Sequence, residues 1–259
     1  MRALMDKYMV LIKIYMKKYT KYPMELFLKL IYLPVQMLLY IFLWKELLKY
    51  SEIELSYMIC YYLFAILLGY AFPFIHIATD IQKDVEEGTI ANFLVRPVQY
   101  VIPIISRFVA WMVCYSGIFV LAVLFAFFYR GVSLKSLLTF LIYLVFGTAI
   151  EFLIWYNLGL LALKTERIRG VLITFRAFKS LVSGSLIPIS LFPSALRIVT
   201  EFLPMKFYIY TPVNALLEQE TTKNFMCNLI MAMIWIAVLI GIAILQWNNG
   251  LKKLQANIS

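Results

Sequence analysis

The sequence predicts an all-α membrane protein: an N-terminal amphipathic interface helix and six transmembrane helices, with short re-entrant outer helices between the fifth and sixth spans. The first observation is composition, since 63% of the 259 residues are hydrophobic and 15% are charged, whereas soluble domains average about 45–50% and about 25%. The second is a series of six apolar blocks, each long enough to cross about 30 Å of hydrocarbon as a helix. The third is the gathering of basic residues on alternate connections between the blocks.

Residues 1–22 are expected to form an amphipathic helix that lies in the membrane interface. On a helical wheel its lysines and one arginine occupy one side and most of its apolar residues the other. A helix of this kind places its basic side near lipid headgroups. An ordinary cytoplasmic helix packed on a partner is the alternative. Pro23 then breaks the helix, and residues 23–259 form the six-span transmembrane domain.

The six apolar blocks divide this second domain into spans. Two blocks are irregular. The first carries Glu25 and Lys29 in its opening turns, and the fifth carries Arg176 and Lys179 early and Gly184 and Pro188 late. The blocks cover approximately residues 24–44, 57–78, 108–129, 137–163, 171–191 and 225–247.

Lysine and arginine set the orientation of the spans. With the N-terminus inside, the cytoplasmic face receives sixteen basic residues and the outer face seven, and cytoplasmic connections carry the excess of positive charge. Both termini are therefore expected in the cytoplasm. The formal net charge of +10 indicates an anionic lipid surface as partner rather than nucleic acid, because the basic residues lie between apolar blocks instead of forming one patch.

Signatures of catalysis are scarce. The sequence has no phosphate-binding loop of the form G-x-x-x-x-G-K-[ST], so the chain is not expected to hydrolyse ATP itself. We expect no catalytic residue, no metal site and no cofactor in this chain. The one histidine, His76, could handle protons near the inner end of the second span, or it could be a satisfied polar side chain at a helix end.

Glu151 is the most conspicuous charge inside an apolar block. A carboxylate at the bilayer centre costs about 2.5–3.5 kcal/mol on insertion scales, so it should face protein or water. One interpretation is an acid that contacts a substrate or an ion. The other is structural: a pairing with Arg107, Arg176 or another basic residue, or protonation of the carboxyl group.

The connection at 80–100, inside by this topology, has the pattern of a short helix parallel to the membrane. Gly88 can end one helix and Thr89 can cap the next, and Pro97 closes it, because proline disfavours helical geometry in the residue before it. The segment would offer a small apolar face to a groove on another protein. That face consists of Ile90, Phe93 and Leu94.

The outer segment 183–217 is too apolar for a solvated loop, yet its prolines forbid one straight helix. Broken backbone is tolerated at membrane depth only where protein shields it or where it lines a cavity. We expect two short helices, at about 194–202 and 212–217, that dip back into the outer leaflet. The prolines are Pro188, Pro193, Pro204 and Pro212.

The two segments together resemble the type-2 (exporter-class) permease subunits of ATP-binding-cassette transporters. The inner stretch is similar to that family's E-x-G-T-[LI]…L…P coupling-helix pattern, except that many members carry a basic residue where this chain has Glu87. The outer stretch is similar to the proline-punctuated segment before the last span. The inner residues are Glu86, Glu87, Gly88, Thr89, Ile90, Leu94 and Pro97, joined by Phe93 on the apolar face; the outer ones are Ser183, Gly184, Pro188, Pro193, Leu203, Pro204, Tyr210, Thr211 and Pro212.

The resemblance implies a mechanism and partners. A second permease subunit, identical or, as we favour, a sister permease, would complete the translocation pathway in a bacterial cytoplasmic membrane. Two separate ATPase subunits would bind ATP and Mg²⁺ and push on the coupling helix through Ile90, Phe93 and Leu94, and the N-terminal helix would rest on the same ATPase. By the same analogy the exported cargo would be amphipathic, such as a drug, a peptide or a lipid.

An ATP-independent channel or secondary carrier is the alternative. Carriers usually show intramembrane ionisable networks or inverted repeats around broken helices, whereas Glu151 is nearly isolated and the breaks cluster in one outer segment. An intramembrane enzyme is a third possibility, and the lack of paired catalytic residues argues against it. Co-purification with an ATPase would favour the permease, and transport by the isolated chain in liposomes would exclude it.

Overall fold

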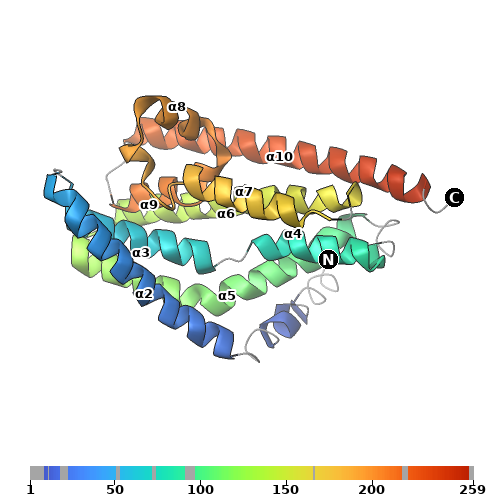
Figure 1. Ribbon diagram of the computed structural model, residues 1–259, viewed down its shortest axis with the longest axis horizontal. Helices are drawn as coiled ribbons and strands as arrows, with labels where there is room; N and C mark the ends of the chain where they lie inside the picture. Colours follow the sequence, from blue (N-terminus) through green and yellow to red (C-terminus); the bar gives the residue numbers. More distant parts are fainter. Residues whose placement is uncertain are drawn as a thin grey trace.

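The computed structural model describes residues 9–10, 12–17, 23–50, 53–71, 74–90, 97–165, 167–217 and 221–256. Within these ranges the chain is helical and contains no β-strand, which confirms the all-α prediction (Figure 1). The helices are α2 (Pro23–Leu47), α3 (Leu55–Ala71), α4 (Ile75–Glu86), α5 (Pro97–Arg130), α6 (Leu134–Leu160), α7 (Arg169–Val182), α8 (Ser194–Phe202), α9 (Tyr210–Leu217) and α10 (Thr222–Ala256), with short 3₁₀ turns η1 (Leu48–Tyr50), η3 (Leu161–Leu163), η4 (Ile189–Leu191) and η5 (Pro204–Phe207).

The long helices α5, α6 and α10 lie roughly along one axis of the molecule (Figure 1). α3 and α4 follow one another in the same direction, α5 runs back, and α6 runs in the direction of α3 and α4 again. At one end of this axis α4 ends, α5 begins and α10 ends; at the other end α5 ends, α6 begins and α8 lies beside the start of α10. The connection predicted to be cytoplasmic and the segment predicted to be outer therefore lie at opposite ends of the bundle.

Two helices are long and apolar enough to cross a membrane among the described residues. They are Leu134–Leu163, which continues α6 through η3, and Thr222–Gly250 of α10. The two halves of α5, Tyr100–Cys114 and Phe119–Arg130, meet at 47° and make a third if they are counted as one span. These correspond to the fourth, sixth and third predicted blocks, and the full count of six stays a prediction.

The second predicted block, 57–78, is not one continuous helix. α3 ends at Ala71, and α4 begins at Ile75 and extends to Glu86. The sequence has a proline at position 73, and proline disfavours helical geometry in the preceding residue. The 12-residue α4 buries one stripe, which includes Ile77 and Ile81, so it packs as an amphipathic helix rather than as the end of a uniformly apolar span.

The fifth predicted block, 171–191, also fails as one continuous spanning helix. α7 has 14 residues and is therefore about 21 Å long, too short to cross the hydrocarbon core alone. Behind it the backbone turns at Gly184, whose φ of +83° is a conformation that only glycine adopts readily. The charges that interrupted this block in the sequence lie on α7, a helix that buries few of its side chains.

The short outer helices were predicted well. α8 covers Ser194–Phe202, and α9 begins at Tyr210 and ends at Leu217, two residues longer at its start than expected. Pro193 precedes α8 in extended geometry, and Pro204 opens the turn η5 that follows it. The existence of these helices is confirmed, and their depth in a membrane stays a prediction.

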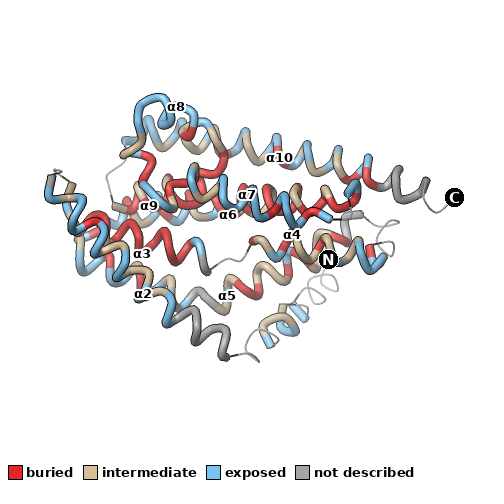
Figure 2. The backbone as a smooth tube through the Cα atoms, viewed as in Figure 1, coloured by how far each residue is buried: buried red, intermediate tan, exposed pale blue. Residues whose placement is uncertain are grey.

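Apolar side chains cover much of the outside of the bundle. Figure 2 shows exposed and intermediate residues along α2 and α10, while α3 is mostly buried, and exposed residues also predominate towards the C-terminal end of α5. Only 11% of the most apolar stretch of α10 is buried. Large apolar residues on other helices and on α10 are more than half exposed, among them Leu39, Leu121, Phe128 and Leu245. Apolar patches of this size mark a surface that meets lipid or another protein.

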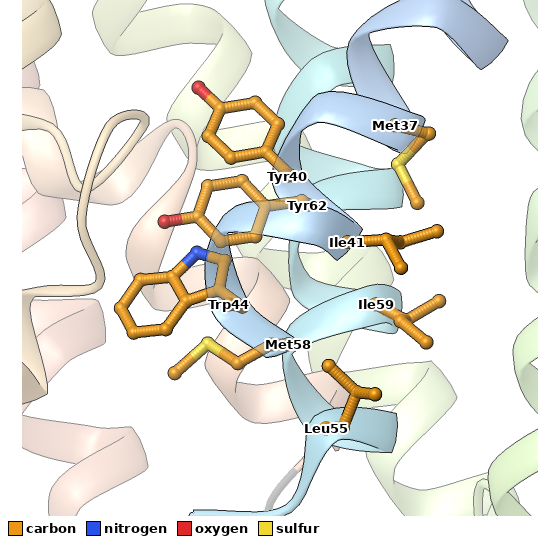
Figure 3. A pocket seen from close by; sticks show the side chains of 8 residues that line it. All are labelled: Met37, Tyr40, Ile41, Trp44, Leu55, Met58, Ile59 and Tyr62. Atoms are coloured by element: carbon orange, nitrogen blue, oxygen red, sulfur yellow. The ribbon is translucent and has the colours of Figure 1, made fainter. Parts of the chain in front are cut away.

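An aromatic seam joins α2 to α3 (Figure 3). The rings of Tyr40 and Tyr62 stack with their centroids 3.9 Å apart, and Trp44 lies 6.0 Å from Tyr62. The space between the two helices has no volume that a water molecule could occupy, so dry packing between large side chains holds the first span to the core.

α6 is the central helix, and two of its glycines let other backbones come close. A Cβ atom at Gly147 would lie 2.1 Å from the carbonyl oxygen of Phe207 in η5, and one at Gly159 would lie 3.0 Å from the Cα of Ala78 in α4. α6 therefore touches the outer segment at its middle and α4 near its C-terminal end.

We expect Gly147→Ala to lower the thermal unfolding midpoint of the detergent-purified protein, because the new methyl group would meet backbone rather than a movable side chain. Overpacking of this kind costs about 1–3 kcal/mol or more. Gly241→Ala in α10 is the matched control, since nothing lies within 4 Å of its added Cβ and alanine favours a helix over glycine by about 1 kcal/mol. Equal midpoints for the two variants would contradict the close approach of η5 to α6.

Candidate functional site

The inner segment after α4 is organised by Asp84. The hydroxyl group of Thr89 donates to the Asp84 carbonyl at 3.2 Å and to Oδ1 at 3.3 Å, and the hydroxyl group of Tyr100 in α5 donates to Oδ2 at 3.1 Å. Gly88 makes the turn between them with a φ of +69°, the left-handed conformation typical of a residue just past a helix end. One carboxylate thus ties the end of α4 to the start of α5.

The predicted coupling residues occupy different positions around this turn. Glu86 is the last residue of α4 and accepts a 2.6 Å hydrogen bond from Gln82, while Glu87 lies 3.6 Å from Lys83 in an exposed ion pair. Pro97 opens α5, as its fixed φ allows, whereas Phe93 and Leu94 lie outside the described residues. Thr89, expected to cap the next helix, bonds back to Asp84 instead.

Ile90 is not part of an exposed apolar face. Its side chain is 2% exposed and belongs to the main hydrophobic core. In this structure the face expected from Ile90, Phe93 and Leu94 therefore lacks its first member, and Ile90 anchors the turn to the bundle. Docking of this segment on a partner protein stays a prediction.

A second cluster of contacts lies close to the inner segment. Arg107 of α5 forms an ion pair with Asp80 of α4, and its guanidinium carbon lies 5.5 Å from the centre of the Tyr15 ring. The described part of the N-terminal helix thus packs on α5 beside α4. Arg107 is therefore engaged with Asp80 and does not neutralise Glu151.

Glu151 lies at the centre of the bundle with 0% exposure. Its Oε1 forms an ion pair with Lys179 of α7 and accepts a 2.6 Å hydrogen bond from the indole nitrogen of Trp155. The ammonium group of Lys179 also lies 5.9 Å from the Trp155 ring centre and 5.1 Å from that of Tyr208. The basic partner of Glu151 is Lys179 rather than Arg107 or Arg176, and a role as an acid that contacts a substrate or an ion stays a prediction.

We expect Lys179→Met to reduce accumulation of the protein in membranes, because it leaves the Glu151 carboxylate buried without its counter-ion. Removing one partner of a buried pair costs about 3–5 kcal/mol, whereas replacing both is often neutral. The double variant Glu151→Gln, Lys179→Met should recover most of the loss, as measured by quantitative blotting of membranes and by thermal unfolding. Losses that simply add in the double variant would show that the two side chains do not interact.

Tyrosines hold the irregular outer segment against α3. Tyr61 donates to the carbonyl of Gly184 at 2.7 Å, Tyr62 donates to that of Leu186 at 2.6 Å, and Tyr57 donates to the side chain of Asn214 at 3.0 Å. In the reverse direction, Tyr208 donates to the carbonyl of Leu68 in α3. Sequence reasoning missed these residues, although three tyrosines between positions 57 and 62 of an apolar block were a visible signal for hydroxyl groups that needed partners.

The residues singled out in the outer segment 183–217 differ in burial. Gly184 is buried at the sharp turn, and Tyr210 begins α9 and borders a polar cavity of about 480 Å³. The prolines divide between buried positions (Pro188, Pro204 and Pro212) and an exposed one (Pro193).

No group of three metal-ligating side chains comes together among the residues that the structure describes. His76 is exposed in the first turn of α4, where its carbonyl accepts a 3.2 Å hydrogen bond from Thr79. This placement agrees with a polar side chain at a helix end.

A helical bundle with at least two helices long and apolar enough to cross a membrane, among the described residues, is typical of a membrane protein. A family model described as ABC-2 family transporter protein matches residues 30–257, nearly the whole chain, and the protein belongs to this family. ABC-2 permeases are the membrane components of ATP-binding-cassette transporters and work with ATPase subunits. Neither the search of curated proteins nor the search of solved structures finds a match.

Proposed function

We propose that this chain is one of two permease subunits of an ATP-driven exporter, and that separate ATPase subunits supply the ATP and Mg²⁺ site. Membership of the ABC-2 family carries the proposal. The structured turn after α4 supports it, since it presents Glu86, Glu87, Gly88 and Thr89 at the surface. No covalent chemistry is assigned to this chain, and its role is to convert a push from outside the membrane into movement of its helices.

The contacts of α4 suit such a push. The helix packs against α6 through Ile77, Ala78 and Ile81, with Gly159 of α6 allowing the close approach. Asp84 links the same helix to α5 through Tyr100. A force on the turn therefore acts on α4, α5 and α6 together, because close-packed elements move as units rather than deforming.

The proposed arrangement in the membrane has six crossings with both termini in the cytoplasm of a bacterial cell. The excess of basic residues on one side supports it, as does the common end at which α4 and α10 stop and α5 starts (Figure 1). In this arrangement residues 1–22 form the interface helix, residues 80–100 the coupling segment, and residues 183–217 the re-entrant outer segment of the domain 23–259.

The second permease, which we favour as a sister chain, and an amphipathic cargo rest on the family analogy. The exposed apolar faces of α2, α5 and α10 leave room for both a partner and lipid (Figure 2). An ATP-independent channel or carrier is the competing function, and association with an ATPase separates the two.

We expect the chain to retain its ATPase on co-purification and Leu94→Asp to weaken that association about tenfold, as loss of an apolar interface anchor does. The measurement is the ATPase-to-permease ratio after affinity purification of tagged permease from membranes. Leu196→Asp is the control, since Leu196 is an exposed apolar residue of α8 at the opposite end of the bundle. Transport by the isolated chain in ATPase-free liposomes would rule out the exporter assignment.

We expect Gly88→Ala to lower the ATPase activity of the reconstituted complex while leaving membrane accumulation unchanged. At the φ of +69° found for Gly88, an added Cβ meets no atom within 4 Å, so the effect would come from backbone strain of about 1–2 kcal/mol. Gly170→Ala on α7 also has open space around its Cβ and no positive φ, and it should behave as the wild type. The same activity in both variants would mean that the shape of the turn does not matter for coupling.

A further inference from the structure

A polar cavity of about 210 Å³ lies between α2, α3, α7 and the start of the outer segment. Its polar lining comes from α2 and from α7 with the turn behind it. α2 contributes Gln36 and Tyr40, and α7 with the turn contributes Arg176, Lys179, Ser180, Ser183 and Ser185. The proposed coupling role uses none of these side chains, and Lys179 belongs to the ion pair with Glu151.

In the proposed six-span arrangement, the cavity lies at membrane depth. Gln36 is near the middle of the 25-residue α2, about 20 Å from its inner end and about 16 Å from its outer end by the rise of an α-helix. Both distances place it well inside a hydrocarbon core of about 30 Å. Ionisable groups at this depth are expensive and are usually found where they line a pathway or bind a ligand.

The charged side chains of the lining are both cations. Lys179 is neutralised by Glu151, whereas Arg176 makes no ion pair with any residue that the structure describes and is exposed on α7. No carboxylate is among the described residues that line the cavity. The cavity therefore has a net positive potential that favours a bound anion.

Two buried polar atoms at the cavity have no hydrogen-bond partner in the described structure. They are the hydroxyl oxygen of Ser183, a residue with 0% exposure, and Oε1 of Gln36. A buried polar group without a partner costs about 1–3 kcal/mol, and more in hydrocarbon, where no solvent can replace the missing bond. A ligand that accepts a hydrogen bond from the Ser183 hydroxyl would remove part of that cost.

We propose that this cavity binds the anionic headgroup, a phosphate or a carboxylate, of an amphiphile that enters from the bilayer. Arg176 supplies the charge and two donors, and Ser183 supplies a third. Sites for whole drug-sized ligands measure about 300–1,000 Å³, so 210 Å³ holds a headgroup but not its tail. Exposed apolar side chains beside the lining, Leu181, Leu186 and Ile187, offer the tail a surface. The inference deepens the proposed function by naming the chemical class of the cargo.

The test is binding of dodecyl phosphate to the full-length permease in a neutral maltoside detergent, measured by calorimetric titration. Arg176→Gln should weaken binding about tenfold, the effect of losing one hydrogen bond between charged groups, and Arg176→Lys should retain most of the affinity. Arg169→Gln is the matched control, because Arg169 is an exposed cation on the same helix outside the cavity lining, and it should bind within about twofold of the wild type. Ser183→Ala should weaken binding without lowering the unfolding midpoint.

Three outcomes would overturn the proposed headgroup site. The first is equal affinity of the Arg176→Gln and Arg169→Gln variants for dodecyl phosphate. The second is equal binding of dodecyl phosphate and zwitterionic dodecylphosphocholine, and the third is a loss of permease–permease association in Arg176→Gln with unchanged affinity. Inorganic phosphate that binds as tightly as dodecyl phosphate would show a free-anion site instead of a headgroup site. The titration needs no ATPase, so the two hypotheses are tested separately. A negative titration would not change the ATPase co-purification result, and a negative co-purification would not change the titration.

Discussion

The hydrogen bonds between the tyrosines of α3 and the backbone after α7 are the constraint on which the outer half of the molecule depends. Tyr61 and Tyr62 donate to the carbonyls of Gly184 and Leu186, just where the fifth apolar block stops being helical. A helix satisfies its own polar backbone groups, but a turn in an apolar environment needs partners from elsewhere. The tyrosines bring both the hydroxyl group for the carbonyl and the ring for the core, so the chain can turn without water.

α6 joins the two ends of the protein. At its middle Gly147 receives the backbone of η5, and near its C-terminal end Gly159 receives α4. Between them Glu151 reaches Lys179 of α7 through an ion pair. One helix thus contacts the outer segment, the cavity-lining helix and the helix that leads to the coupling turn. Under the proposed function, these direct contacts of α6 offer a route by which a displacement of α4 would reach the outer segment.

Sequence patterns captured the elements whose signal is local. The prolines at 193 and 204 marked the limits of α8, and long uninterrupted hydropathy located α6 and α10. Hydropathy failed for α3–α4 and for α7, because it averages over a block and does not register a break inside it. The partner of Glu151 and the burial of Ile90 were beyond reach for another reason. Both depend on which helices become neighbours in the fold. The sequence alone offered several basic residues as possible ion-pair partners of Glu151 and gave no way to choose among them.

The charges that weakened the fifth apolar block as a span are informative for the same reason. α7 continues past both charges to Val182, and the turn at Gly184 follows it. Lys179 is needed to neutralise Glu151, and Arg176, one turn earlier on α7, faces the cavity. An anion bound at Arg176 would attract Lys179 as well and would compete with Glu151 for it. Because binding energies are reciprocal, a change in α6 that strengthens the Glu151–Lys179 pair would weaken the hold on that anion.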